Sequence, residues 1–359
     1  MIDFEIPEEL AFLGETARSF ARAELAPRER EHESARAVTP EVRERFEETG
    51  LAGVELPEDL GGAGLGALAR TLVLEELAAA DAGAALALDP LGPALPALRE
   101  LGDSALRELA APLLATRGAR AVLAFDLAHQ LECRGDRLRG EIAWVAADRV
   151  DLLVVLRADE ILVARGGIEP APLRGAGLRA AGASALHLDR APIVAHLAAS
   201  RGAARARARA RLYGAALLVG VMRAAADFSR EYALQRVAFG RPIAHHQALA
   251  FLIADLASAV DGSRLLVLEA ASRLDRGLDG AEACASAFLE CAEQAMFVAP
   301  NALQILGGHG FMQDYPLEKW MREARALGLC FGGVDAAREE AGAELAAART
   351  PLELTAAEG

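Results

Sequence analysis

Cysteine is scarce in this sequence, which limits the chemistry that sulfur can carry. The 359 residues contain four cysteines, namely Cys133, Cys284, Cys291 and Cys330. No two of them form a CxxC pair, a spacing that favours a reducing compartment and no thiolate metal site. Cys284 and Cys291 lie seven residues apart on an expected helix, so we expect them to pack in the core.

Histidine clusters of the kind that bind metals are also lacking. His245 and His246 are adjacent, but no cysteine or carboxylate cluster accompanies them. Metal sites need several ligands converging on one point, and two neighbouring side chains do not meet that need. We therefore expect no metal site.

Basic residues are in the minority. The chain has 38 Lys and Arg against 52 Asp and Glu, a formal net charge of −14. Nucleic acids and membrane surfaces attract basic faces, so the charge argues against both as partners. No apolar run reaches the length of a membrane span, and the acidic N-terminus does not resemble a signal peptide. We expect a soluble, cytoplasmic protein in which an anionic ligand needs a local basic pocket.

Aromatic residues make up only 5% of the chain, although 53% of it is hydrophobic. The apolar excess consists mainly of Ala, Leu and Val, and Ala and Leu are strong helix formers. A chain of this length exceeds a single hydrophobic core and predicts two or three domains. The expected fold is mainly α with a small central β domain.

The pattern of turns and periodic segments divides the chain into four parts. Residues 1–117 are expected to form an N-terminal helical domain, in which Pro7 and Pro40 suit the starts of helices. Residues 118–200 show short apolar runs and a hairpin signal after Cys133, which predict a reduced middle β domain. Residues 201–349 are expected to form a C-terminal helical bundle, followed by a tail at 350–359.

Predicted helices can be given bounds from their periodicity and their terminal Gly or Pro residues. In the N-terminal part they cover 67–80 and 93–115. In the C-terminal part they cover 204–232, 247–277, 280–307, 318–329 and 335–347.

One motif joins two of the long C-terminal helices. It reads Arg236-x-x-Phe239-Gly240-x-Pro242, and Gln247 follows at the start of the next helix. A turn between helices would explain Gly240 and Pro242 by itself, but not the whole set of residues. An arginine offers a fork of donors that suits phosphate oxygens, so a ligand contact is the alternative interpretation.

A second motif follows another long helix. It contains Gln304, Gly307, Gly308 and Gly310, and then Asp314-Tyr315-Pro316-x-Glu318-Lys319-x-x-Arg322. Glycines permit close approach to backbone amides, which can donate to phosphate oxygens. A glycine run alone could simply end a helix, so the signal depends on the complete pattern.

Together these motifs resemble the C-terminal domain of the acyl-CoA dehydrogenases. The segment Gly50-Leu-Ala-Gly-Val…Pro57-Glu-Asp-Leu-Gly-Gly is similar to that family's N-terminal connecting loop, and the resemblance covers almost the whole chain. It implies a helical domain, a β domain and a four-helix bundle. It also implies FAD as cofactor, an acyl-CoA as substrate, an electron-transfer flavoprotein as acceptor and assembly as a tetramer.

The resemblance assigns roles to particular residues. Arg236 would contact the FAD pyrophosphate across a subunit interface, Phe239 would pack on the cofactor and Gln247 would donate hydrogen bonds. Gln304, Gly307 and Gly308 would lie against the adenosine diphosphate half, and Trp144 against the flavin ring. Arg211 would contact the coenzyme A phosphates, whereas the other arginines of 201–211 are expected to be solvated.

The residue that abstracts the α proton is missing at both of the family's usual positions. Counting from Gly308 places the usual glutamate at Phe331, with Gly332 and Arg338 still in register. The family's other base position falls on Ala210. Neither side chain can accept a proton, and Asp335 would point elsewhere in the helical register.

The middle domain also departs from the family pattern. Ala124-Phe125-Asp126 runs almost directly into the next strand, so the usual Thr-Glu-Pro and Gly-Ser-Asp elements are absent, and Ala146 replaces the hydroxyl residue after Trp144. The chain thus lacks residues that would hold its own flavin ring and retains those that reach a neighbour's flavin.

Three hypotheses follow. In the first, the chain is a subunit of a heteromeric acyl-CoA dehydrogenase whose homologous partner supplies the glutamate, and bulky acyl groups such as steroid side chains are plausible substrates. The backbone N–H of Phe331 could still donate to a thioester carbonyl. In the second, it is a stand-alone flavoenzyme with different chemistry, and in the third it is a cofactor-free scaffold or regulatory subunit.

Overall fold

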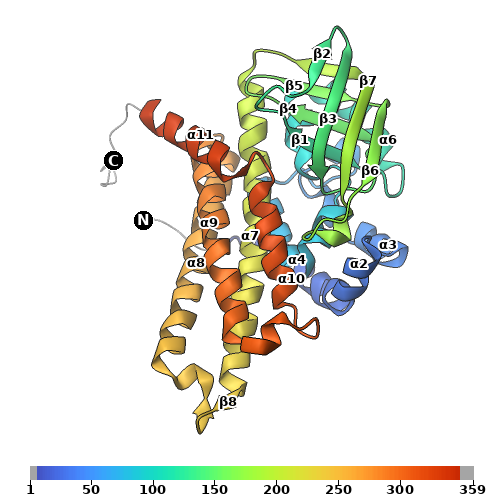
Figure 1. Cartoon of the computed structure of the whole chain (residues 1–359). Helices are drawn as coiled ribbons and strands as arrows, with labels where there is room; N and C mark the ends of the chain where they lie inside the picture. Colours follow the sequence, from blue (N-terminus) through green and yellow to red (C-terminus); the bar gives the residue numbers. More distant parts are fainter. Residues whose placement is uncertain (1–5, 348–359) are drawn as a thin grey trace.

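The computed structural model describes residues 6–347 (Figure 1). Helices at the N-terminus, a single mixed sheet and long C-terminal helices follow one another along the chain. The expected fold class, mainly α with a small central β domain, is confirmed.

The described N-terminal region contains six α-helices. They are α1 (Glu8–Phe20), α2 (Glu29–Ala35), α3 (Pro40–Thr49), α4 (Ala67–Leu88), α5 (Leu95–Glu100) and α6 (Asp103–Leu114). The longest connection, between α3 and α4, includes two short 3-10 helices. Pro7 immediately precedes α1 and Pro40 is the first residue of α3, as their fixed φ angles favour.

Two N-terminal helices differ from the prediction. The helix expected over 93–115 is divided into α5 and α6, because Gly102 adopts φ 93° between them. The helix expected over 67–80 continues to Leu88 through a break at Asp81, which has φ −158° and ψ 104°. Asp81 Oδ1 accepts a hydrogen bond of 2.9 Å from the amide of Ala84, so this carboxylate starts the second half of α4.

The sheet contains seven strands in the order β1-β4-β5-β7-β3-β2, with β6 also paired to β7. The strands are β1 (Ala121–Phe125), β2 (Glu132–Arg134), β3 (Arg137–Val145), β4 (Leu152–Leu156), β5 (Ile161–Ala164), β6 (Ile168–Pro172) and β7 (Ser184–Leu197). β1 and β4 are parallel, and the other pairs are antiparallel. The hairpin expected after Cys133 joins β2 to β3, where Gly135 adopts φ 61° in a two-residue turn.

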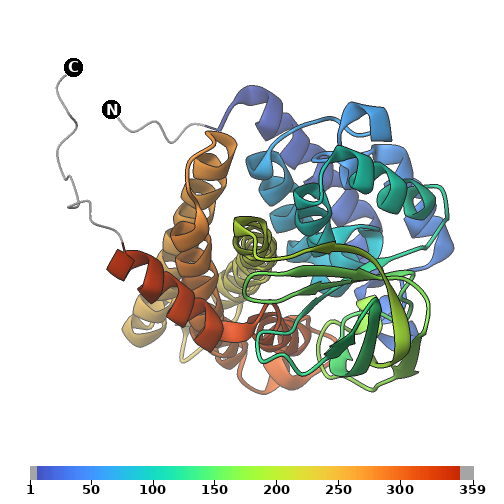
Figure 2. The same ribbon diagram turned by 90° about the horizontal axis from the view of Figure 1, so that it is seen from above.

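The C-terminal region consists of α7 (Arg201–Gln235), α8 (Gln247–Asp275), α9 (Ala281–Ile305), α10 (Leu317–Leu329) and α11 (Gly333–Ala347). Figure 2 shows α7 at the centre, between the N-terminal helices and the α8–α9 pair. α7 is long and apolar enough to span a membrane, but 72% of its apolar window is buried inside the protein. It is therefore a core helix of the bundle.

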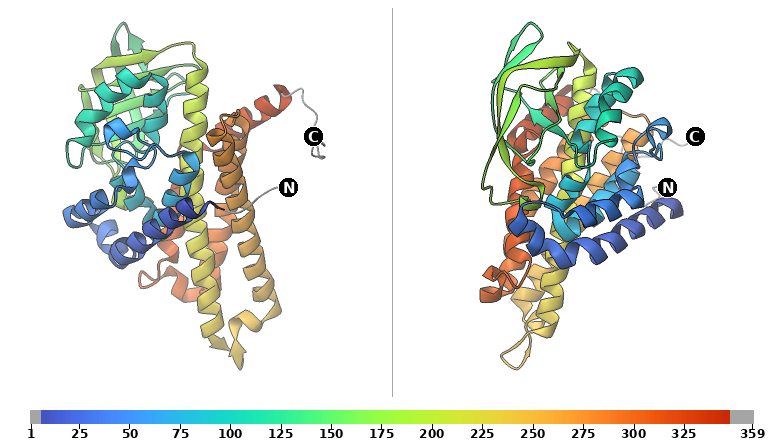
Figure 3. Two further views of the ribbon diagram at one scale, coloured as in Figure 1. Left: turned by 180° about the vertical axis from the view of Figure 1, so that it is seen from behind. Right: turned by 90° about the vertical axis from the view of Figure 1, so that its right-hand side faces the viewer.

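A small hairpin connects α7 to α8. Its strands are β8 (Val237–Ala238) and β9 (Arg241–Pro242). The hairpin projects from the end of the bundle that is opposite to the sheet (Figure 3). Helix α7 therefore begins beside the sheet and ends at the hairpin (Figure 3).

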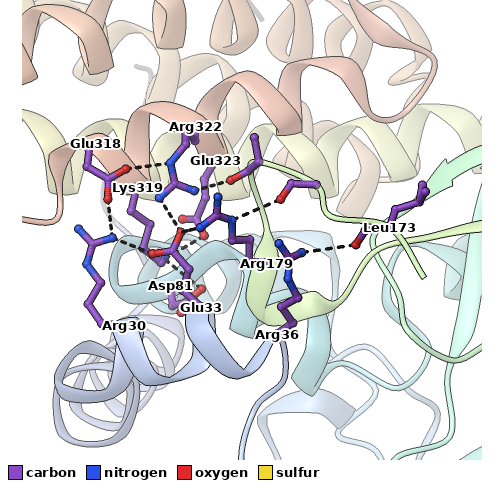
Figure 4. Close-up of polar contacts among 12 residues, drawn as sticks. Arg30, Glu33, Arg36, Asp81, Leu173, Arg179, Glu318, Lys319, Arg322 and Glu323 are labelled. Atoms are coloured by element: carbon purple, nitrogen blue, oxygen red, sulfur yellow. Dashed lines mark hydrogen bonds and ion pairs between the residues drawn. The ribbon is translucent and has the colours of Figure 1, made fainter. Parts of the chain in front are cut away.

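A buried ionic cluster joins the N-terminal and C-terminal helices (Figure 4). Lys319 on α10, the only lysine of the chain, is almost completely buried. Its Nζ lies 2.9 Å from Glu323 Oε1 and 3.3 Å from Asp81 Oδ1. The neighbouring carboxylates raise the pKa of Lys319 against the opposing effect of burial, so the amine stays charged.

A second carboxylate joins three segments around this cluster. Glu33 on α2 accepts hydrogen bonds from Arg322 Nη2 at 2.5 Å and from Arg30 Nη1 at 2.7 Å. Arg179, in the turn before β7, lies 3.3 Å from the same carboxylate. The three regions of the chain are therefore fixed to one another by buried and half-buried charges (Figure 4).

Replacing Lys319 by Met should destabilise the protein by about 3 kcal/mol or more, because Asp81 and Glu323 would remain buried without their cation. Chemical denaturation followed by circular dichroism measures the change. The matched control Arg338→Met removes a cation whose side chain is 56% exposed, and its effect should stay within about 0.5 kcal/mol. Equal effects of the two variants would contradict the role given to Lys319.

Candidate functional site

A cavity of about 310 Å³ lies between the sheet and the helices. Its walls come from β1, from β3 and from the turn after α10, with Leu86 and Pro93 from the N-terminal region. Trp144 and Ala146 line it from β3, and Phe331 and Gly332 from the turn. The structure thus brings the predicted flavin-ring residue Trp144 to the same cavity as Phe331, the residue expected at the usual base position.

No carboxylate lines this cavity in the described part of the chain. Its ionisable residues are Arg120 and Cys330. Burial raises the pKa of the Cys330 thiol to about 12, and the thiol points to the carbonyl of Ala326 at 3.3 Å. Cys330 is therefore protonated at neutral pH and cannot serve as a base.

Arg120 gives the cavity wall a positive charge that sequence reasoning did not identify. Its Nη1 and Nη2 donate to the carbonyls of Ala181 and Leu86 at 2.9 and 3.0 Å, close to the C-terminal ends of two helices. Its Nε has no hydrogen-bond partner in the described structure, and burial lowers the pKa of this guanidinium. An electron-rich group in the cavity would therefore be favoured.

The two usual base positions lie close together and neither carries a carboxylate. Phe331 adopts φ 56° and its ring packs 5.9 Å from the ring of Phe288. Ala210 is completely buried on α7, one turn before Gly214, which contacts Phe331. The helix and the turn thus meet as the sequence register implies, with apolar side chains at both positions.

Arg211, the predicted substrate contact, is fully buried and already paired. It forms an ion pair with Glu340 on α11, and its Nε donates to the carbonyl of Phe331 at 3.3 Å. Arg207 also contacts Glu340, at 2.7 Å. Contact between Arg211 and coenzyme A remains a prediction, and it would require α11 to release this arginine.

Two further carboxylates are unavailable as substitute bases in this conformation. Asp126, directly after β1, is buried and accepts a hydrogen bond of 3.0 Å from Arg157 Nε. Asp335 has a side chain that is 90% exposed and lies on α11 beside Arg338. Neither lines the cavity.

The other predicted cofactor residues gather at the hairpin end of the bundle. Arg236, Phe239 and Gln247 are exposed there, and Phe239 is 96% exposed. Arg236 makes no ion pair with any residue between 6 and 347. Further exposed apolar side chains along this end of the bundle are Leu234, Val237, Phe251, Phe311 and Met312.

The glycine loop after α9 lies at this same end. Tyr232, near the end of α7, is 2.8 Å from His309 Nδ1 in that loop. Gly307 adopts φ 58°, and a Cβ built at Gly307 or Gly308 would meet no atom within 4 Å. Gln304 is exposed beside them. The loop therefore leaves its backbone open to a ligand, as a phosphate contact requires.

The two groups of residues are far apart within one chain. Arg236, directly after α7 and before the hairpin, lies 22 positions along the chain from Gly214, which is beside the cavity. At 1.5 Å per residue this is about 33 Å. The structure thus places Trp144 at one site and the six residues Arg236, Phe239, Gln247, Gln304, Gly307 and Gly308 at another.

Comparison with known proteins identifies the fold and the family. Residues 7–117 match the acyl-CoA dehydrogenase N-terminal domain, and residues 180–345 match the C-terminal domain. This chain belongs to the acyl-CoA dehydrogenase family. It is 29% identical to cyclohex-1-ene-1-carbonyl-CoA dehydrogenase of Geobacter metallireducens, over 89% of this chain and 93% of the relative. It is 28% identical to acryloyl-CoA reductase (NADH) of Anaerotignum propionicum, over 90% of this chain and 91% of the relative.

Solved structures agree with the family assignment. Butyryl-CoA dehydrogenase of Megasphaera elsdenii superposes with a TM-score of 0.83 at 22% identity, covering 96% of this chain and all of that one, so it shares the fold. A chain from a structure described as the electron transferring flavoprotein of Acidaminococcus fermentans gives 0.84 at 26% identity, over 96% and 99%. A glutaryl-CoA dehydrogenase of Mycobacterium smegmatis with this fold was solved in complex with FADH2.

The two sites differ in how well they fit a flavin dinucleotide. The hairpin end offers an arginine that forms no ion pair within residues 6–347, an exposed ring and approachable backbone amides, which suit a diphosphate and its neighbouring rings. The cavity offers the half-buried Trp144 and the Arg120 charge, but Ala124 and Ala146 give it no side-chain hydrogen bonds. The fit is therefore better at the hairpin end.

The effects of substitutions at Gly214 and Phe331 on the free energy of unfolding should be coupled. A Cβ at Gly214 would lie 2.4 Å from Phe331 Cδ2, so Gly214→Ala should cost about 1–3 kcal/mol of stability. In the Phe331→Ala background the cost should be at least about 1 kcal/mol smaller. Denaturant titration of the four proteins measures this coupling.

Gly262→Ala is the matched control for that cycle. A Cβ at Gly262 on α8 would meet no atom within 4 Å, so this change should be neutral or slightly stabilising in both backgrounds. Strictly additive effects of Gly214→Ala and Phe331→Ala would show that the two residues do not share this space.

Proposed function

We propose that this chain is one subunit of a heteromeric, FAD-dependent acyl-CoA dehydrogenase. A homologous partner chain would supply the catalytic glutamate and most contacts to the flavin ring. The proposal rests on one observation: the residues suited to FAD lie exposed about 33 Å from a cavity to which residues 6–347 contribute no carboxylate.

The hairpin end of this chain would serve a flavin held mainly by the partner. Arg236 would bind the diphosphate, because a guanidinium donates two parallel hydrogen bonds to phosphate oxygens. Phe239 would cover an apolar face of the cofactor, which accounts for an aromatic ring that is 96% exposed in the single chain. Gln247, Gln304 and the amides at Gly307 and Gly308 would orient the remaining polar groups.

Bound FAD would accept the hydride from the β carbon of the acyl group. The residues of this chain would bind and position the cofactor, and the partner's carboxylate would remove the α proton. Electrons would then pass to an electron-transfer flavoprotein. A cytoplasmic heterotetramer is the assembly we propose, with a bulky acyl-CoA such as a steroid side-chain thioester as a substrate of the partner's site.

This chain's own cavity would keep a binding function. Among residues 6–347, the amide of Phe331 donates to no backbone carbonyl, so it remains available to a thioester carbonyl. Without a base, an acyl-CoA bound there would not be dehydrogenated. This arrangement also fits the alternative of a regulatory subunit, in which ligand binding rather than turnover would be the role of the cavity.

Flavin content tests the proposal. The chain should be purified alone and together with a homologous chain that carries the glutamate, and the FAD absorbance of each preparation compared. We expect the isolated chain to be colourless and the complex to contain flavin. A full complement of FAD in the isolated chain, with turnover, would instead support a stand-alone flavoenzyme.

Two substitutions test the hairpin. Arg236→Ala and Phe239→Ala should each weaken FAD binding to the complex by roughly tenfold or more, since charge-assisted hydrogen bonds and desolvated aromatic contacts contribute on that scale. Flavin retention during dilution and fluorescence titration of the stripped complex measure the effect. Arg338→Ala and Phe12→Ala, both at exposed positions, are the matched controls. Unchanged flavin affinity in the hairpin variants would exclude a contact in trans.

A further inference from the structure

The ring of Phe331 stands between the cavity and the interior of the helical bundle. Phe331 lines the cavity. On its other side the ring lies 6.3 Å from the ring of Tyr213 on α7 and 5.9 Å from that of Phe288 on α9. Tyr213 and Phe288 are both buried, so the space behind the Phe331 ring belongs to the core.

The helical bundle leaves a space at Gly214 that the Phe331 ring fills. Gly214 on α7 has no side chain, and a Cβ there would lie 2.4 and 2.5 Å from two carbons of the Phe331 ring. The ring therefore occupies the space that any larger residue at position 214 would need. The fold therefore accommodates the Phe331 ring through a specific packing contact with Gly214.

The backbone around Phe331 is held as well. Phe331 adopts φ 56°, and Gly332 and Gly333 that follow it adopt φ 86° and 74°. The Phe331 carbonyl accepts a hydrogen bond from Arg211, whose guanidinium is fixed by Glu340. These contacts fix the backbone of the turn, and the ring itself is held by its packing against Tyr213, Phe288 and Gly214.

The cavity that remains is small. Its volume of about 310 Å³ is at the lower limit of ordinary ligand pockets, which hold about 300–1,000 Å³. A void of only about 20 Å³ borders Tyr213, and its walls also contain the charged residues Glu55, Arg70 and Arg209. An apolar chain cannot extend in that direction while the ring is present.

We propose that Phe331 sets the length of the acyl group that this chain accepts. The cavity would take a compact acyl thioester, and the Phe331 ring would exclude acyl chains that have to extend past it into the bundle. This inference rests on the proposed function, because it assumes that the cavity binds a coenzyme A thioester. It concerns the cavity of this chain and leaves the partner's site free to hold a bulkier substrate.

Acyl-CoA binding measured by calorimetry tests the inference. Butyryl-CoA and dodecanoyl-CoA are titrated into the full-length chain, alone and in complex with its homologous partner, whose own catalytic site is blocked by a tight inhibitor. The wild-type chain should bind butyryl-CoA at least tenfold more tightly. Phe331→Ala should reduce this preference at least tenfold by gaining affinity for dodecanoyl-CoA, since burial of two more methylene groups suffices for roughly that change.

Two further variants keep the test decisive. Phe12→Ala removes an exposed ring on α1 and should leave the preference unchanged. Phe331→Leu keeps a large apolar side chain and serves if Phe331→Ala is too unstable to study. Its preference for butyryl-CoA should be weaker than that of the wild-type chain. Circular dichroism and thermal melting establish that each variant is folded.

The outcomes separate the inference from the proposed function. Equal affinity of the wild-type chain for the two thioesters, or an unchanged preference in Phe331→Ala, would overturn the inference while acyl-CoA binding itself is retained. Failure of both thioesters to bind folded wild-type and Phe331→Ala proteins would overturn acyl-CoA binding by this chain and the inference with it. A flavin-containing complex in that case would still support the cross-subunit role of the hairpin.

Discussion

Helix α7 fixes the distance on which the functional interpretation depends. It runs without interruption from Arg201 to Gln235, and its central part is buried between α4 and α9. A helix held on several sides cannot bend enough to bring its two ends together. The cavity near Gly214 and the hairpin after Gln235 are therefore separate sites in one chain. This separation supports the proposal that a second chain completes the cofactor site.

The buried charges around Lys319 supply the rigidity that this geometry requires. Ion pairs removed from water contribute little net stability compared with apolar contacts, because desolvation offsets their attraction. They do, however, penalise any arrangement in which one partner is lost. Asp81 illustrates this: it interrupts α4, starts the next helical turn and faces Lys319 of α10. The position of α10, and with it the turn that carries Phe331, is thus tied to the N-terminal helices.

Much of the fold could be predicted from local signals. Pro7 and Pro40 mark helix starts, and the turn after Cys133 marks a hairpin, because each depends on the conformational preference of one or two residues. The break at Asp81 and the division at Gly102 were missed, since a helical pattern continues through both. The same Asp81 carboxylate also pairs with Lys319, a partner more than 200 residues away that no local window contains.

The candidate site shows the same division between chemistry and packing. The absence of a base at Phe331 and Ala210 is a prediction from the sequence, because phenylalanine and alanine cannot accept a proton wherever they lie. The pairing of Arg211 with Glu340, the Arg120 charge and the fit of Phe331 against Gly214 could not, since each joins segments distant in sequence. These contacts bear on the interpretation of phenylalanine at position 331. A pocket that had only lost function would be expected to fill loosely or to collapse. Here the ring has a matching glycine, a restrained turn and an adjoining cavity, and these features support the proposal that the site binds a ligand without transferring a proton.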